Sequence, residues 1–227
     1  MTILIDISLT TIPPRFSKIG KTLNSLLNQT TKIQNIWLNI PRNYKRFPKW
    51  DGVLPEVPNG IKIHRINEDL GPASKILPIL NNPSAEEYIL YCDDDWEYEP
   101  TWAETFVFHR GKKQSAIAAS TFDVERLRKK NGVIAQGFGG VLIRKNFFLM
   151  ADTIIDKSFT WVDDIWLSAC LCKNRIKVLK NVEASTLYRC SISDKHELQN
   201  SSFNSMKRAD LNKIASNRAT EIFGIWK

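Results

Sequence analysis

The sequence lacks long hydrophobic runs. It has no stretch of about eighteen consecutive apolar residues, so we expect no transmembrane helix. Its first ten residues, MTILIDISLT, carry neither the basic region nor the cleavage site of a signal peptide, and their Ile and Leu content predicts a strand. Internal repeats and low-complexity segments are also missing. The 227 residues, 43% hydrophobic and 25% charged, suffice for one folded domain with a substantial core.

Cysteine is scarce as well. The four cysteines, Cys92, Cys170, Cys172 and Cys190, fit neither a zinc site nor a disulfide framework. Cys170 and Cys172 form a C-x-C inside an apolar segment rather than a C-x-x-C pair. We therefore expect buried free thiols in a reducing cytosol.

Acidic residues are fewer than basic ones, with 24 aspartates and glutamates against 32 lysines and arginines. The formal net charge is +8, which favours an anionic partner such as a nucleotide, an acidic acceptor, a membrane surface or nucleic acid. Nine lysines and arginines but only two acidic residues lie between Arg110 and Lys145, so this basic stretch holds most of the excess. It would suit a phosphorylated or lipid-linked acceptor, or peripheral docking on an anionic membrane, and it also fits an ordinary solvated face. Because no helix-turn-helix, zinc finger or RNP-type motif is present, we expect no nucleic-acid partner.

Strand-like and helix-like patterns alternate along the first half of the chain. Apolar strand patterns occupy residues 2–10, 35–40, 61–66 and 88–92, and helical patterns occupy residues 19–27 and 75–80. The second half is less regular, with strand patterns at 116–121, 140–144 and 177–179, an apolar helix at 161–172 and a basic helix from Phe203 onward. The alternation predicts an α/β fold, a central, mostly parallel sheet flanked by helices, in a single domain over residues 1–227.

Polar residues follow three of these strands. They are Pro13 to Arg15, Asp69 to Lys75, and the acidic triplet Asp93, Asp94 and Asp95. In such sheets ligands bind at the carboxyl ends of the strands, so the three segments should share one rim. If the triplet is extended, Asp93 and Asp95 share a face and Asp94 points the other way. Mg²⁺ and Mn²⁺ take one or two carboxylates together with phosphate oxygens, which favours a metal–diphosphate site over an inert acidic turn.

The triplet after an apolar strand resembles the DXD motif of GT-A glycosyltransferases, especially the family 2-like enzymes. Four further segments resemble family segments in the same order: SLTTIPPRF at 8–16, NEDLGPASK at 67–75, GFGGVLIRK at 137–145 and WVDDIWLSACL at 161–171. The resemblance covers most of the chain. Small enzymes of this kind decorate bacterial surface polysaccharides and, in some large viruses, capsid proteins.

The resemblance implies a GT-A, Rossmann-like fold, with a nucleotide-binding half at 1–100 and an acceptor-binding half at 101–227. It implies a metal-dependent hexosyl- or deoxyhexosyltransferase that uses Mn²⁺ or Mg²⁺ and a nucleotide-sugar donor, UDP favoured. The acceptor would be a hydroxyl of a glycan, a lipid-linked or a protein-linked glycan, and the anomeric carbon would be inverted. We expect a cytoplasmic protein, with peripheral contact at the inner face of a membrane as an option through the basic stretch.

The resemblance also assigns site residues. The residues implied in donor binding are Thr10, Pro13, Arg15, Asp69, Lys75, Asp93, Asp94, Gly139 and Gly140. The implied metal ligands are Asp95, Asp93 and His196, although His196 also fits an exposed histidine. Asp164 is the implied catalytic base.

Several roles have an alternative. Asp163 is expected as the helix cap or an acceptor ligand, because aspartate is a preferred N-cap. Asp69 could instead cap the turn at Gly71. Trp161 and Trp166 could wall an acceptor pocket, with Trp166 favoured as core. Residues 126–130 are a candidate for a loop that closes over the substrates.

Three other function classes compete. A sugar nucleotidyltransferase would need a glycine-rich first loop, whereas this loop is Ile12-Pro13-Pro14-Arg15-Phe16. A basic nucleic-acid-binding domain would leave the acidic triplet unexplained. A catalytically inactive carbohydrate- or nucleotide-binding module is the alternative that the sequence does not exclude, and donor turnover distinguishes it from an enzyme.

Overall fold

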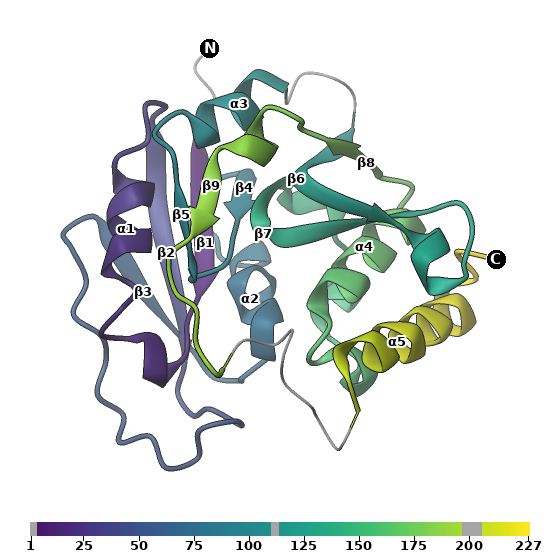
Figure 1. Cartoon of the computed structure of the whole chain (residues 1–227), viewed down its shortest axis with the longest axis horizontal. Coiled ribbons are helices and arrows are strands. Elements are labelled where there is room, and N and C mark those ends of the chain that lie inside the picture. The colour runs from purple at the N-terminus through teal and green to yellow at the C-terminus, as the bar shows by residue number, and fades with distance from the viewer. Residues whose placement is uncertain (1–3, 110–113, 197–205) are drawn as a thin grey trace.

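A computed structural model describes residues 4–109, 114–196 and 206–227, and its centre is a seven-stranded sheet with the strand order β3-β2-β1-β4-β7-β6-β8 (Figure 1). The strands are β1 (Ile5–Thr10), β2 (Ile33–Pro41), β3 (Ile61–Ile66), β4 (Tyr88–Tyr91), β6 (Ser115–Asp123), β7 (Val133–Arg144) and β8 (Lys177–Lys180). Every neighbouring pair is parallel except the two that involve β7. The predicted mostly parallel mixed sheet is confirmed.

Helices and short turns complete the described parts of the chain. The α-helices are α1 (Gly20–Leu27), α2 (Leu77–Leu80), α3 (Trp102–His109), α4 (Asp163–Lys173) and α5 (Arg208–Phe223). A second, two-stranded antiparallel sheet consists of β5 (Trp96–Tyr98) and β9 (Tyr188–Cys190). Single 3-10 turns span Pro13–Arg15, Gly71–Lys75, Val124–Leu127, Lys145–Phe147, Met150–Thr153, Lys157–Phe159 and Ala184–Thr186.

The two faces of the large sheet have separate hydrophobic cores. On β4, Ile89 and Tyr91 pack with α2, α4 and α5, while Leu90 packs with α1 and α3 on the other face. This period of two is what a strand buried on both faces requires. Helices therefore cover both sides of the sheet, as predicted, and α4 and α5 lie side by side (Figure 1).

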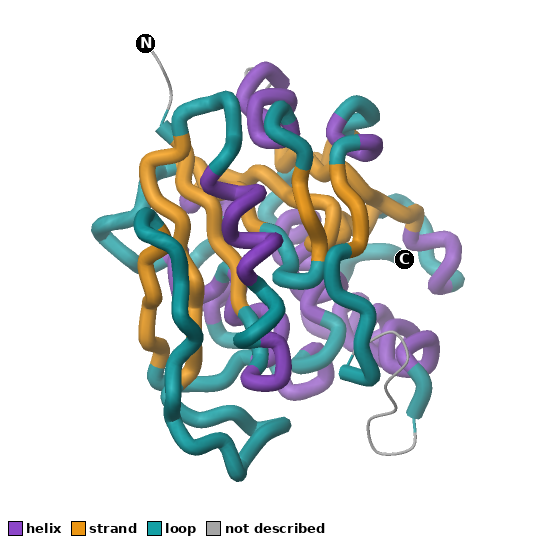
Figure 2. The backbone as a smooth tube through the Cα atoms, turned by 60° about the vertical axis from the view of Figure 1, so that its left-hand side comes forward, coloured by secondary structure: helices purple, strands orange, loops and turns teal. Residues whose placement is uncertain are grey.

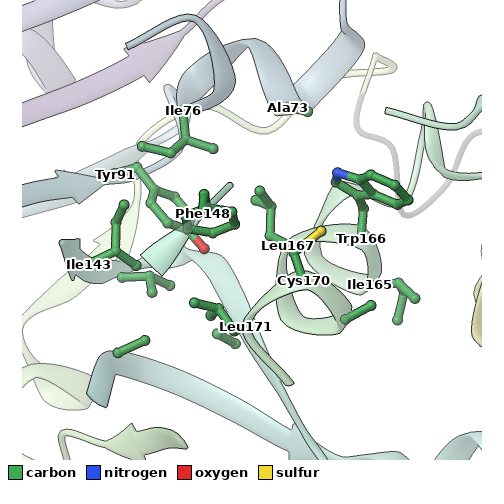
Figure 3. Packing of buried hydrophobic residues seen from close by; sticks show 14 of the residues in the cluster. Ala73, Ile76, Tyr91, Ile143, Phe148, Ile165, Trp166, Leu167, Cys170 and Leu171 are labelled. Atoms are coloured by element: carbon green, nitrogen blue, oxygen red, sulfur yellow. The ribbon is translucent and has the colours of Figure 1, made fainter. Parts of the chain in front are cut away.

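Helix α4 is the buried helix that the sequence predicts. Its Leu167, Cys170 and Leu171 lie close to Tyr91 and Ile143 of the sheet (Figure 3). Such a helix is apolar nearly all round because it is covered on several sides. Trp166 is 5% exposed and donates its indole N–H to the Asp152 carbonyl at 3.1 Å. The core role favoured for Trp166 is therefore confirmed.

Several boundaries differ from the sequence predictions. β3 matches, whereas β7 begins at Val133 rather than Gly140, because glycines interrupt its apolar pattern. The helix predicted at 75–80 is divided into a 3-10 turn and α2, with a proline near the start of each. Helix α3 and the short strands β5 and β9 were not predicted. Residues 2–3 of the first predicted strand and 203–205 of the last predicted helix lie outside the described residues.

All four cysteines are free, as expected. Cys92 and Cys170 are buried, whereas Cys172 is only half-buried and Cys190 is exposed at the end of β9, so the prediction of burial holds for two of the four and is wrong for Cys190. Within the described ranges, no helix has the length and apolarity needed to cross a bilayer. The cytoplasmic location stays a prediction.

Candidate active site

A pocket of about 520 Å³ opens at the carboxyl ends of β1 and β4. The segments after these strands and the start of α4 line it, together with the loop of residues 42–60, which is the long loop at the lower left of Figure 2. The pocket brings together most of the site residues implied by the resemblance: Thr10, Arg15, Asp69, Lys75, Asp93, Asp94, Asp95, Asp163, Asp164 and His196. Pro13, Gly139 and Gly140 do not line it.

The acidic triplet forms a turn. β4 ends at Tyr91, and Asp94 and Asp95 lie in a turn before β5 begins at Trp96. The expected alternation of faces, which assumed an extended strand, is therefore wrong. All three aspartates line the pocket.

Arg15 binds two aspartates of the triplet. Its Nη1 lies 2.6 Å from Asp94 Oδ1 and 3.0 Å from Asp95 Oδ2, and its Nε lies 3.1 Å from Asp194 Oδ2. The Thr11 hydroxyl also donates to Asp94, at 2.5 Å. Burial alone would lower the pKa of Arg15, but the charges of Asp94 and Asp95 raise it overall. The guanidinium therefore holds the triplet in place.

Lys75 connects the triplet to α4. Its Nζ lies 2.6 Å from Asp93 Oδ1 and 2.9 Å from Asp163 Oδ2, and its side chain is only 3% exposed. The Ser8 hydroxyl donates to the Lys75 carbonyl at 2.5 Å, which fixes the backbone. Burial disfavours the charged amine, yet the charges of Asp163 and Asp93 raise the pKa of Lys75 well above its usual value. Lys75 is thus a buried cation between two carboxylates.

Gly137 gives this cation its space. A Cβ at Gly137 would lie 2.4 Å from Lys75 Nζ and 3.4 Å from Asp164 Oδ1. Only a glycine lets the β7 backbone approach both side chains this closely. The Gly137 N–H in turn donates to Asp164 Oδ1 at 3.0 Å.

Asp163 and Asp164 open α4, but neither caps it. The N-cap residue is Val162, which makes no side-chain cap hydrogen bond, so the capping role predicted for Asp163 is wrong. Asp163 is instead held by Lys75. Burial, and then the charge of Asp163, raises the pKa of Asp164 to about 7, against the lowering effect of Lys75. A carboxylate with a pKa near neutrality is suited to accept a proton.

Asp95 and Asp93 have the chemistry of a divalent-cation site. Burial, followed by the charges of Asp94 and Asp93, raises the pKa of Asp95 to about 7, and a bound cation would relieve that repulsion. Among the described residues, no three His, Cys, Asp or Glu side chains form a group that could hold a metal. Mg²⁺ and Mn²⁺ need only one or two carboxylates when phosphates and water complete the shell. The two aspartates therefore fit the ion that the resemblance implies.

His196 does not form such a three-ligand group with these aspartates. Its ring packs against Phe47, with ring centres 5.6 Å apart. Its backbone N–H donates to Asp194 Oδ1 at 2.8 Å. These contacts fix the segment after β9 at the rim of the pocket.

The remaining implied donor residues have structural partners. Asp69 accepts backbone N–H groups of Gly71 at 2.9 Å and Lys45 at 2.7 Å, which matches the turn-capping alternative. A Cβ at Gly139 would lie 3.0 Å from the Tyr188 ring. Gly140 has a φ of +97°, and a Cβ there would lie 2.3 Å from Trp102. These two glycines permit close packing outside the pocket.

The described part of the basic stretch reaches the pocket only through uncharged side chains, those of Phe122, Gln136 and Phe138. None of its described lysines and arginines lines the pocket, and residues 110–113 lie outside the described residues. Arg144 pairs with Glu87, and Lys145 Nζ donates to the Asn82 carbonyl at 2.6 Å. Residues 126–130 lie in the connection between β6 and β7 and do not line the pocket either. The suggestion that these residues close over the substrates is not supported.

The pocket also contains residues that the sequence analysis missed: Tyr44, Arg46, Phe47, Trp96, Phe122, Gln136, Phe138, Ile165, Arg208 and Asn212. Arg46 and Phe47 follow the carboxyl end of β2, so the strand-end rule could have found them. Arg208 and Asn212 come from α5, and no local pattern points to them.

No protein-family model matches the sequence, and the search of curated proteins finds no match. Among solved structures, the crystal structure of S. aureus TarS has a TM-score of 0.49 and 12% sequence identity, covering 85% of this chain and 37% of that chain. The crystal structure of S. aureus TarS 1–349 has a TM-score of 0.49 and 14% identity, covering 80% of this chain and 58% of that chain. This chain thus spans less than two thirds of either TarS chain, and a likeness of this size carries no argument about activity.

Proposed function

We propose that the protein is a metal-dependent glycosyltransferase that moves a sugar from a nucleotide-sugar donor, UDP favoured, to a hydroxyl of a glycan, lipid-linked or protein-glycan acceptor, with inversion. The observation that carries the proposal is that the acidic triplet and the Asp163–Asp164 pair line one pocket and are bridged by Lys75. Carboxylates for a metal–diphosphate and a separate base with a pKa near 7 are the two parts that such a transfer needs. The five segments that resemble GT-A enzymes support the same reaction.

Each residue then has a chemical role. Asp95 and Asp93 would hold Mn²⁺ or Mg²⁺, which when bound supplies positive charge against the departing diphosphate. Asp164 accepts the proton of the acceptor hydroxyl as that oxygen attacks the anomeric carbon. The Gly137 N–H orients one oxygen of Asp164, and Lys75 holds the neighbouring Asp163. One base acting on the face opposite the leaving group gives inversion.

Nucleotide release from UDP-, GDP- and dTDP-sugars, with Mn²⁺ and with EDTA, tests the proposal. We expect slow hydrolysis of one donor by the wild type, loss of that hydrolysis in EDTA and in Asp95→Asn, and retention in Asp210→Asn. Asp210 is an exposed residue of α5 that does not line the pocket, so it controls for the loss of one carboxylate.

Donor-dependent thermal stabilisation is measured in parallel, since the acceptor can be required for turnover. If no donor is hydrolysed and none raises the melting temperature, the protein is not a glycosyltransferase of this kind. Binding without turnover under any acceptor condition would instead identify an inactive nucleotide-binding module.

A further inference from the structure

Two arginines from distant parts of the chain meet at Trp161. Arg208 is the first residue of α5, and its Nη1 donates to the Trp161 carbonyl. Arg46 comes from the 42–60 loop, and its guanidinium carbon lies 5.9 Å from the centre of the Trp161 ring. All three residues line the pocket. Trp161 is therefore the point at which two cations converge in the site.

Arg208 differs from Arg15 and Lys75, two other cations of the pocket, in its partners. Arg15 and Lys75 are each bound by two or more carboxylates. Across the part of the chain that the structure describes, Arg208 forms no salt bridge, and Trp161 is the partner found for it. A guanidinium has five N–H donors, and the described residues account for one of those of Arg208, so the others can serve a ligand. Their planar fork matches a carboxylate or a phosphate.

Arg208 and the candidate base line the same pocket. The positive charge of Arg208 is one of the influences that lower the pKa of Asp164. Asn212, one helical turn after Arg208, lines the same pocket, as does Ile165 of α4. An anion bound at Arg208 would therefore occupy the same pocket as the hydroxyl that gives its proton to Asp164.

We propose that Arg208, assisted by Arg46 and Asn212, binds an anionic group of the acceptor, a carboxylate or a phosphate ester, next to the reacting hydroxyl. The inference rests on the proposed function and names its acceptor class. It assigns the binding of an anionic acceptor, which was expected of the basic stretch, to two arginines inside the pocket instead. The acidic half of the pocket serves the donor, and the side near α5 serves a negatively charged acceptor.

Ligand-observed NMR titrations test this site with three probes: methyl β-glucoside, methyl β-glucuronide and glucose 6-phosphate. We expect the two anionic probes to bind the wild type roughly ten- to a hundredfold more tightly than the neutral one. Arg208→Gln should remove that preference and leave the affinity for methyl β-glucoside unchanged. Lys213→Gln, which removes one charge from the same helix outside the pocket, should keep the preference. Arg208→Lys keeps the positive charge but loses the planar guanidinium, and it should retain part of the preference for the anionic probes.

The probes also separate the two anion sources, since the tighter of the glucuronide and the phosphate identifies the group. Equal binding of charged and neutral probes by the wild type would overturn the inference. The inference would also be overturned if Arg208→Gln bound UDP more weakly but still preferred the anionic probes, because Arg208 would then bind the donor diphosphate. UDP, GDP and dTDP are titrated alongside. If no nucleotide binds, the proposed function fails on its own, whereas nucleotide binding without an anion preference removes only this inference.

Discussion

Replacing Lys75 with methionine tests the central ion-pair arrangement without any assumption about substrates. The ammonium lies within 2.9 Å of two carboxylates and is 3% exposed, while Asp163 is equally buried. Removing one member of a buried ion pair leaves an uncompensated charge and costs about 3–5 kcal/mol. For a chain of this length, that lowers the melting temperature by roughly 6–20 °C.

The loss should depend on pH. Lys75 lowers the pKa of Asp164, so its removal raises that pKa further above the unfolded value. A carboxylate whose pKa is raised by folding destabilises the fold at every pH above its unfolded pKa, and a further rise adds to this penalty only above the wild-type pKa of about 7. Lys75→Met should therefore cost more stability at pH 8 than at pH 5.5.

Urea unfolding at both pH values measures the effect. Lys45→Met is the matched control, because Lys45 is 55% exposed and its partner Glu68 is 71% exposed. Such a surface pair contributes about 0–1 kcal/mol. If Lys75→Met loses no more stability than Lys45→Met at either pH, Lys75 is not a buried link between the triplet and α4.

Three further outcomes are expected. Gly137→Ala should lower the free energy of unfolding in urea by about 1–3 kcal/mol, because its Cβ would meet a Lys75 side chain that two carboxylates hold in place. Gly20→Ala is the control, since a Cβ there would meet nothing within 4 Å and should leave the free energy of unfolding unchanged. Equal losses in the two variants would contradict the packing argument. Donor turnover by the wild type should decline as pH falls below about 7, where Asp164 becomes protonated. Asp164→Asn should reduce turnover by roughly 10²–10⁴-fold at every pH. A wild-type turnover that does not change between pH 5.5 and 8 would exclude Asp164 as the base. In the absence of metal, Asp95→Asn should raise the free energy of unfolding by about 1–3 kcal/mol at pH 8 and by less at pH 5.5, because the pKa of Asp95 is raised to about 7. A destabilised variant at pH 8 would mean that the ion pair of Asp95 with Arg15 outweighs its burial and its repulsion by Asp94 and Asp93.

The location of the pocket could be predicted from the sequence, whereas its internal pairing could not. Parallel strands bring their carboxyl ends to one edge of a sheet, so the segments after β1 and β4 had to meet once the strands were recognised. The pairing depends on contacts between residues far apart in the chain. Arg15 reaches Asp94 across 79 positions and Asp194 across 179. No local pattern encodes such distances.

The conformation of the acidic triplet also depends on contacts that the local sequence does not predict. Three consecutive aspartates after a strand are compatible with a continued strand or with a turn, and the strand period alone favoured the wrong geometry. Thr11, 83 positions away, donates to Asp94 and helps to fix the turn. For the same reason the N-cap preference failed at Asp163, because a buried lysine provides a partner that the helix end does not.

The charges of the pocket account for both the failed local rules and the proposed chemistry. The triplet, Asp163 and Asp164 place five carboxylates around two buried cations, Arg15 and Lys75. Negative charge therefore remains in excess, and burial together with this excess raises the pKa values of Asp95 and Asp164 to about 7. Such an arrangement reduces the stability of the fold on its own and becomes favourable when a cation or a proton arrives. Asp95 lies at the triplet, where a divalent cation would relieve the repulsion, and Asp164 lies at α4, where the proton of an acceptor hydroxyl would. The same excess charge thus favours a metal at one end of Lys75 and a base at the other.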